Sequence, residues 1–115
     1  MIDFACKRFD INNIIKCGLG LTRAELKVMQ YFLRHMDFEF TTDALSRKTK
    51  LDLTTIQKAV KKLTEKKIIS RSQKNLDTGG YVFFYKCNSK QSIRDVLKKI
   101  IRNWSENVEM HIDSW

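Results

Sequence analysis

Residues 41–71, TTDALSRKTKLDLTTIQKAVKKLTEKKIISR, and residues 79–87, GGYVFFYKC, decide the fold. In the first stretch a threonine cap predicts a short helix over 43–49, and a tight turn follows it. Asp52 is a good N-cap for a second helix, from Leu53 to about Lys66. The apolar side chains of this second helix recur at helical spacing; they are Ile56, Ala59, Val60 and Leu63. The order predicts a helix-turn-helix.

A β-hairpin is predicted directly after this helix pair. Residues 68–74 alternate and are rich in β-branched side chains, whereas 81–85 is the strongest strand signal in the chain. Turn formers fill 75–80, which predicts a six-residue tip. A hairpin in this position is a wing. We therefore expect a mostly α fold with a small β-hairpin, a winged helix-turn-helix.

Further helices are expected on both sides of the helix-turn-helix. Residues 3–17 read as one helix that stops at Gly18, although Asp10 could instead begin a shorter one. Thr22 and Glu25 form a capping box for a helix to about His35. A short strand is expected at 38–41.

A long helix is predicted to begin at Ser89 or Ser92 and to end near His111. One apolar stripe follows it for about six turns; the stripe consists of Ile93, Val96, Leu97, Ile100, Ile101, Trp104, Val108, Ile112 and Trp115. The predicted division is an N-terminal helix within 1–20, a winged helix-turn-helix domain at 21–88 and a C-terminal helix at 89–115.

The charge is strongly positive and concentrated. The 115 residues carry 22 basic and 13 acidic side chains, a net charge of +9, and residues 47–74 hold +8 of it. This indicates an anionic partner, nucleic acid or a membrane surface. A membrane is not expected as the partner, because the basic region belongs to a compact fold and is not a lone amphipathic helix. No uncharged run exceeds the eight residues of 78–85, so no bilayer span is expected, nor does the N-terminus read as a signal peptide. With three cysteines, an odd number, we expect a reducing, cytoplasmic location.

On these residues the chain resembles the winged helix-turn-helix of MarR-like and TrmB-like regulators, as found in small archaeal transcriptional regulators. The matching motifs are Leu51–Ile56 at the start of the recognition helix, Leu63–Ile69 at its end, and the Gly-Gly-Tyr of the wing. The resemblance covers roughly 22–101 and implies a regulator that binds double-stranded DNA. TrmB regulators carry a sugar-binding domain after this part. The chain ends before one, so sugar sensing is not expected.

The outward residues of the second helix suit DNA. Thr54, Thr55, Gln57 and Lys58 are predicted to reach base edges, because such helices enter the major groove with their N-terminal half. The later lysines, Lys61 and Lys62, are predicted phosphate contacts. For the wing we predict backbone or minor-groove contacts by Arg71 and Lys74. Two alternatives stay open: Thr55 as a helix-start residue that bonds its own backbone, and wing charges that protect a strand edge.

A homodimer is predicted from the terminal helices, whose apolar stripes exceed what one small domain can cover. The predicted dimerisation residues are Ile11, Ile15, Ile100, Ile101, Trp104, Val108 and Ile112. In the alternative, the two terminal helices pack on each other within one chain.

Nothing in the sequence points to an enzyme, a metal site or a cofactor. Cys6, Cys17 and Cys87 lack ligand spacing and are expected to be buried thiols, with a redox switch as the less favoured role. A small-molecule effector is unknown. Two other functions stay open: a winged-helix protein-interaction module of a transcription or chromatin assembly, and a nonspecific architectural DNA binder.

Overall fold

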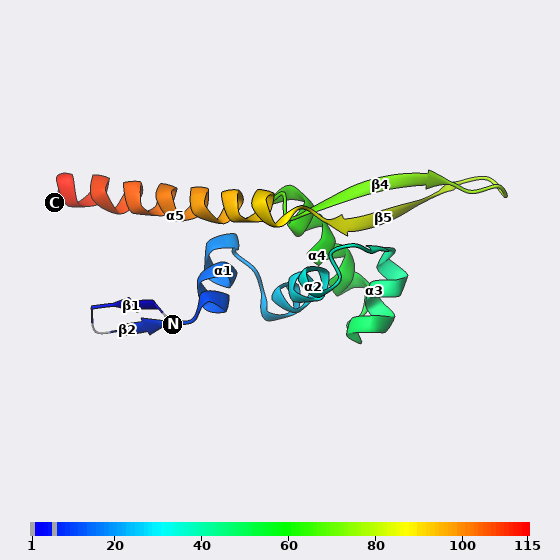
Figure 1. Cartoon of the computed structure of the whole chain (residues 1–115), viewed down its shortest axis with the longest axis horizontal. Helices are drawn as coiled ribbons and strands as arrows, with labels where there is room; N and C mark the ends of the chain where they lie inside the picture. The colour runs from blue at the N-terminus through cyan, green and yellow to red at the C-terminus, as the bar shows by residue number, and fades with distance from the viewer. Residues whose placement is uncertain (1, 6) are drawn as a thin grey trace.

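Five helices and five short strands make up the part of the chain that the computed structural model describes, residues 2–5 and 7–115 (Figure 1). The elements are, in chain order, β1 (Ile2–Phe4), β2 (Lys7–Phe9), α1 (Ile11–Leu19), α2 (Arg23–Arg34), β3 (Glu39–Phe40), α3 (Thr42–Thr49), α4 (Leu53–Glu65), β4 (Ile69–Asn75), β5 (Tyr81–Cys87) and α5 (Lys90–Asp113). The mostly helical winged helix-turn-helix is confirmed.

The core forms where α2, α3 and α4 pack together. The side chains that fill it from these helices are fully buried; they include Val28, Met29, Phe32, Leu45, Ile56, Ala59 and Leu63. Each helix begins at its predicted cap, because Thr22, Thr41 and Asp52 accept backbone N–H groups of the first turn. The caps therefore determine where all three helices start.

The wing is a long antiparallel hairpin of β4 and β5, and β3 joins it on the free edge of β5. Asn75 pairs with Tyr81, so the tip comprises the five residues 76–80, one fewer than predicted. At the base of the hairpin Tyr85 and Cys87 are buried in the core. The hairpin thus stands on the core at one end and projects into solvent at the other.

The prediction of one helix over 3–17 is wrong in its first half. β1 and β2 form a separate antiparallel hairpin, with Ile2 opposite Phe9. Asp10 caps the shorter helix α1 by accepting the backbone N–H of Asn12, which was the alternative start. The predicted stop at Gly18 is also wrong. The chain leaves the helix at Gly20, whose φ of +65° lies in the left-handed region that glycine adopts without strain.

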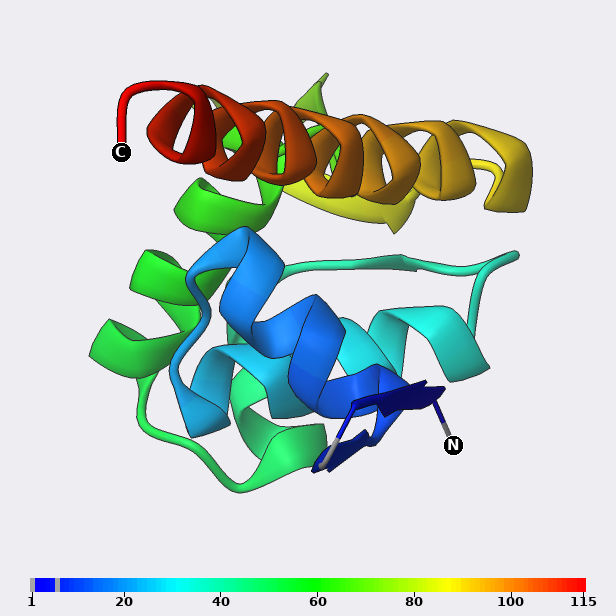
Figure 2. The same ribbon diagram turned by 90° about the vertical axis from the view of Figure 1, so that its left-hand side faces the viewer.

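The helix α5 begins at the Ser89 cap, and its first half lies beside α1 and contacts the core (Figures 1 and 2). Ile93 is buried there, whereas every residue from 101 onward is exposed. We call residues 101–113 the distal half of α5. The chain measures 62 × 24 × 24 Å and its radius of gyration is 17.0 Å, against about 13 Å for a compact domain of this length. The distal half of α5 and the wing account for this elongation, since they project in opposite directions.

Candidate nucleic-acid interface

Most of the residues predicted to read base edges lie on the outer face of α4. Burial of Ile56, Val60 and Leu63 fixes the rotation of the helix. The residues left exposed on the opposite side are Thr54, Gln57, Lys58 and Lys61. Among the described residues, no hydrogen bond or ion pair within the chain engages their side chains. These four side chains are therefore available to a ligand.

Thr55 lies at the same helix start but serves the cap. Its backbone N–H donates to the Asp52 carboxylate at 3.3 Å, and the side chain is half-buried. Hydrogen bonds from the Thr55 side chain and backbone lower the pKa of the Asp52 carboxyl, despite some desolvation. The geometry fits the alternative in which Thr55 bonds the helix start.

Lys62 also turns away from the exposed face. Its ammonium group lies 2.6 Å from the carbonyl oxygen of Gly20 and 3.2 Å from Glu25 Oε1. Partial burial opposes ionisation of Glu25, but the Thr22 backbone N–H and the Lys62 ammonium together hold the pKa of that carboxyl below its ordinary value. The Lys62 ammonium group is thus bound within the fold, whereas the Lys58 and Lys61 side chains are exposed on the outer face of α4.

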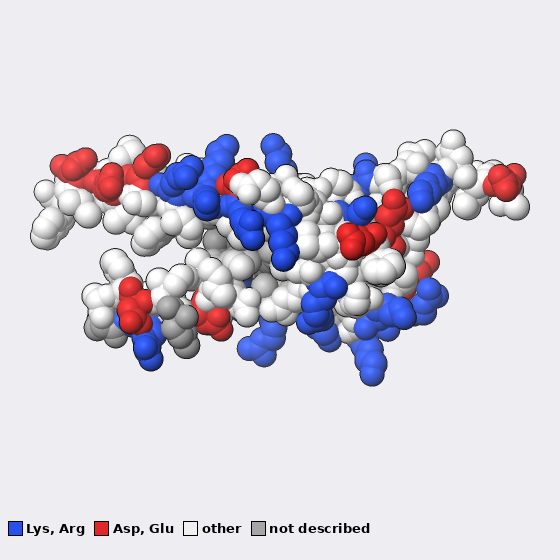
Figure 3. All heavy atoms as spheres, viewed as in Figure 1, with Lys and Arg blue, Asp and Glu red and all other residues white. Residues whose placement is uncertain are grey.

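The two wing cations lie on opposite faces of the hairpin. Arg71 stacks over the Phe83 ring at 4.2 Å from its centroid. Lys74 lies over the Phe84 ring at 4.5 Å and pairs with Glu39 at 2.9 Å. Both cations are held along the strands rather than at the tip, where the charged residue is Asp77. Figure 3 shows acidic atoms at this tip and at the far end of α5.

Sequence reasoning placed a second basic group in the charged segment but did not select it as a site. Arg47, Lys48 and Lys50 are exposed at the end of α3 and in the turn before α4. Lys50 adopts a left-handed conformation with φ +61°, which closes α3 and starts the turn. Their position in the sequence, directly before the recognition helix, could have indicated that these cations extend the candidate interface.

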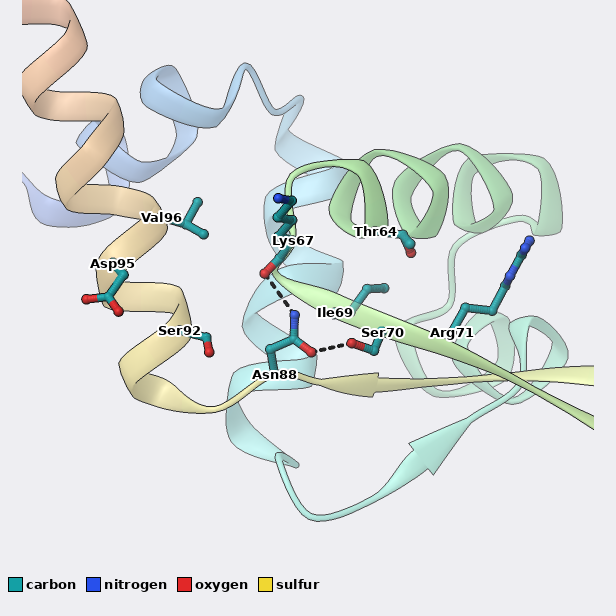
Figure 4. A pocket seen from close by; sticks show the side chains of 9 residues that line it. All are labelled: Thr64, Lys67, Ile69, Ser70, Arg71, Asn88, Ser92, Asp95 and Val96. Carbon is teal, nitrogen blue, oxygen red and sulfur yellow. Dashed lines mark hydrogen bonds between the residues drawn. The ribbon is translucent and has the colours of Figure 1, made fainter.

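A hollow of about 670 Å³ lies at the base of the wing (Figure 4). Asn88 Nδ2 donates to the Lys67 carbonyl at 2.8 Å, and the Ser70 hydroxyl donates to Asn88 Oδ1. Arg71 and Asp95 point away to either side of this pair. The polar groups at its centre are used by the fold, so we interpret the hollow as the joint between the wing and α5.

The cysteines do not form a site. Cys87 is buried, and burial raises the pKa of its thiol. Cys17 is exposed, so the expectation of a buried thiol is wrong there, because it lies on the outer face of α1. Cys6 falls outside the described residues. Within residues 2–5 and 7–115 no three His, Cys, Asp or Glu side chains gather as metal ligands, and no helix is long and apolar enough to cross a membrane.

Comparison with known proteins places this fold in a family. Residues 10–109 match the DnaD N-terminal domain family. The chain belongs to that family. This DnaD N-terminal domain is similar to a possible transcriptional regulator from Methanosarcina mazei Go1, at 50% identity over 100% of this chain and 96% of the other, with a TM-score of 0.92.

Two more distant structures share the fold of this DnaD N-terminal domain. The ST1889 protein from the archaeon Sulfolobus tokodaii is 20% identical over 84% of this chain and 92% of its own, with a TM-score of 0.67. A point mutant of S. aureus MepR, bound to an oligodeoxyribonucleotide, is 11% identical over 91% and 78%, with a TM-score of 0.51. At this identity the two structures show a shared winged-helix fold alone, so kinship with MarR-like or TrmB-like regulators stays a prediction.

Proposed function

We propose that this protein is a sequence-specific regulator that binds double-stranded DNA, rather than an enzyme. One observation carries the proposal: α4 exposes Thr54, Gln57, Lys58 and Lys61 opposite its buried face. In the major groove Thr54, Gln57 and Lys58 would meet base edges. Lys61, further along the helix, would meet a phosphate.

The charge around α4 supports this interpretation. Residues 47–74 hold nearly all of the net charge of the chain, as required for a surface that lies against phosphates. The exposed cations Arg47, Lys48 and Lys50 extend the basic surface from α4 onto α3. A protein-interaction module would more often present apolar side chains on this face.

The wing would add contacts beside the recognition helix. Arg71 and Lys74 lie on opposite faces of the hairpin, so they would reach different phosphates, such as those of the two strands that line a minor groove. Lys74 already pairs with Glu39, and we expect Arg71 to contribute more.

Known relatives support the same class of function. The similar Methanosarcina mazei protein is described as a possible transcriptional regulator, and the MepR mutant carries a bound oligodeoxyribonucleotide. A TrmB-like regulator of an archaeal cytoplasm is the finer form of this proposal. It would use residues 21–88 for DNA and residues 1–20 and 89–115 for dimerisation.

We further propose a homodimer. The distal half of α5 exposes Ile101, Trp104, Val108 and Ile112, and Ile11 of α1 is exposed as well. An apolar groove of about 320 Å³ lies between the two helices; its lining includes Ile11, Ile14, Ile15, Leu97, Ile100 and Ile101. Packing of the corresponding surfaces of two chains would cover both the helix face and the groove.

Selection of bound DNA from a random pool at fixed salt tests the proposal. Enrichment of a two-fold symmetric motif is the expected result. As a matched control, the Gln57→Ala/Lys58→Ala double variant should bind without enriching that motif. Binding of the parent without any enrichment would favour a nonspecific architectural role, and no binding at all would favour a protein-interaction module.

A further inference from the structure

Lys62 is the lysine of α4 whose ammonium group the fold uses. It donates to the Gly20 carbonyl oxygen at 2.6 Å and to Glu25 Oε1 at 3.2 Å. The Lys62 side chain is 34% exposed and that of Glu25 is 10% exposed. A charged pair this sheltered from water holds its geometry better than an exposed pair does. We call these three residues the Lys62 bridge.

The acceptors of the Lys62 bridge belong to two other helices. Gly20 closes α1 and lies between the buried residues Leu19 and Leu21. Glu25 belongs to the first turn of α2, where its carboxylate also accepts the Thr22 backbone N–H at 2.8 Å. One ammonium group therefore joins the recognition helix to the end of α1 and to the start of α2.

The helix α1 in turn lies against α5. Gly18 allows this approach, since a Cβ atom placed there would lie 3.3 Å from Ile100 Cγ2. The chain of contacts thus runs from α5 through α1 and Gly20 to Lys62 on α4. A shift of the α1 end relative to α4 would break the Lys62 bridge unless α4 moved with it.

We infer that Lys62 is a positioning residue that sets the recognition helix relative to the α1–α2 turn, and through it relative to the proposed dimerisation helices. This inference rests on the proposed function. It replaces the predicted phosphate contact by Lys62 with a contact inside the fold. Lys58 and Lys61 keep their place on the outer face, since they are exposed.

Salt dependence separates a positioning residue from a phosphate contact. Loss of a phosphate contact lowers the slope of log affinity against log salt by about 0.9. We expect Lys61→Met to lower the slope by about that amount. Lys62→Met should leave the slope unchanged but weaken binding to the selected motif by about fivefold, the scale of one partly exposed charged hydrogen bond. Binding to random DNA should change less.

Matched variants exclude a general loss of stability. Ile69→Val opens a small gap in the core at the start of β4, outside α1, α2 and α5, and should leave the ratio of specific to random binding unchanged. Lys62→Arg keeps a cationic donor and should restore that ratio. Glu25→Gln keeps the capping oxygen but removes the charge. If the two residues act through one contact, the double variant Glu25→Gln/Lys62→Met should lower the ratio of specific to random binding little more than Lys62→Met alone.

The outcomes distinguish this inference from the proposed function. A slope that falls in Lys62→Met as it does in Lys61→Met would show a direct phosphate contact and overturn the inference alone. So would an unchanged affinity and ratio in Lys62→Met. A parent chain that binds no DNA would overturn the proposed function, and the inference with it.

Discussion

Three lysines of one helix illustrate how position decides the role of a residue. Lys58, Lys61 and Lys62 have the same chemistry, and helical periodicity placed them all outward or on the flank. The structure separates them by what lies within reach of the side chain. Lys62 meets a carbonyl 42 residues earlier in the chain, which no local pattern in the sequence encodes. The contact of Thr55 with the cap at Asp52 is local and fits the alternative role that the sequence left open for it.

We predict that Gln57→Ala affects specificity and that Lys61→Ala does not. Gln57 would lose its hydrogen bonds to one base, so binding to the selected motif should weaken by about 1–3 kcal/mol, with little change for random DNA. Lys61→Ala should weaken both equally, because phosphates carry no sequence information. Titrations of the two DNA classes at matched salt measure the difference. Equal losses in Gln57→Ala would remove its base-reading role.

We predict an acid-sensitive contribution from Glu25. Its folded-state pKa is lowered, so its stabilising contribution is complete above its ordinary value of 4.5 and is lost as the pH falls through the folded-state pKa. The free energy of unfolding of the parent should therefore decrease more steeply below about pH 5 than that of Glu25→Gln. Urea unfolding at several pH values gives both curves. Parallel curves would contradict a role for ionised Glu25.

At the scale of elements, the sequence predicted what local chemistry determines. The capped helices α2, α3 and α4 and the wing lie where the caps, periodicity and turn formers place them. The β1–β2 hairpin was missed because its turn lacks the Asn-Gly or Gly residues that mark hairpins. Ala5 instead adopts φ +52° there. Three-residue strands are also too short to show alternation.

We predict that Gly20→Ala destabilises the junction of α1 and α2. No atom lies within 4 Å of the added Cβ, so crowding is absent, but φ +65° penalises every residue with a Cβ. The expected loss is about 1–2 kcal/mol in the free energy of unfolding. Chemical denaturation measures it. An unchanged midpoint would mean that this turn adapts its backbone at no cost.

We predict that Arg71→Ala weakens DNA binding while the wing stays folded. The Arg71 side chain is exposed and rests on Phe83, and the backbone pairing with Tyr85 does not depend on it. Affinity should fall for all sequences and the salt slope by about 0.9. Lys99→Ala, an exposed cation on α5, is the matched control. If both variants bind as the parent does, the wing has only a structural role.

The whole molecule has more apolar surface than one copy covers. The alternative in which the terminal helices pack together within one chain describes α1 and the first half of α5, where Gly18 meets Ile100. This packing does not cover the distal half of α5, whose residues are exposed. Trp104 is 62% exposed and Ile112 is 61% exposed, and a patch of this kind is rare on soluble monomers. The same segment carries Glu106, Glu109 and Asp113, whose negative charges would repel DNA phosphates.

The last prediction is that two copies associate through the distal half of α5 and the groove beside α1. About 13 residues of helix span roughly 20 Å, enough for a second chain to cover the exposed Trp104 and Val108 and to reach Ile11. A two-fold axis would then set the two α4 helices on successive major grooves, so the selected motif should be an inverted repeat with half-sites about one helical turn apart.

Sedimentation at micromolar concentration should give twice the 13.6 kDa mass of the chain. Truncation after Arg102 should yield a folded monomer, because the residues removed are all exposed in the single chain. A parent that sediments as a monomer would contradict the dimer, and a truncated chain that remains dimeric would assign the interface to α1 and the β1–β2 hairpin instead.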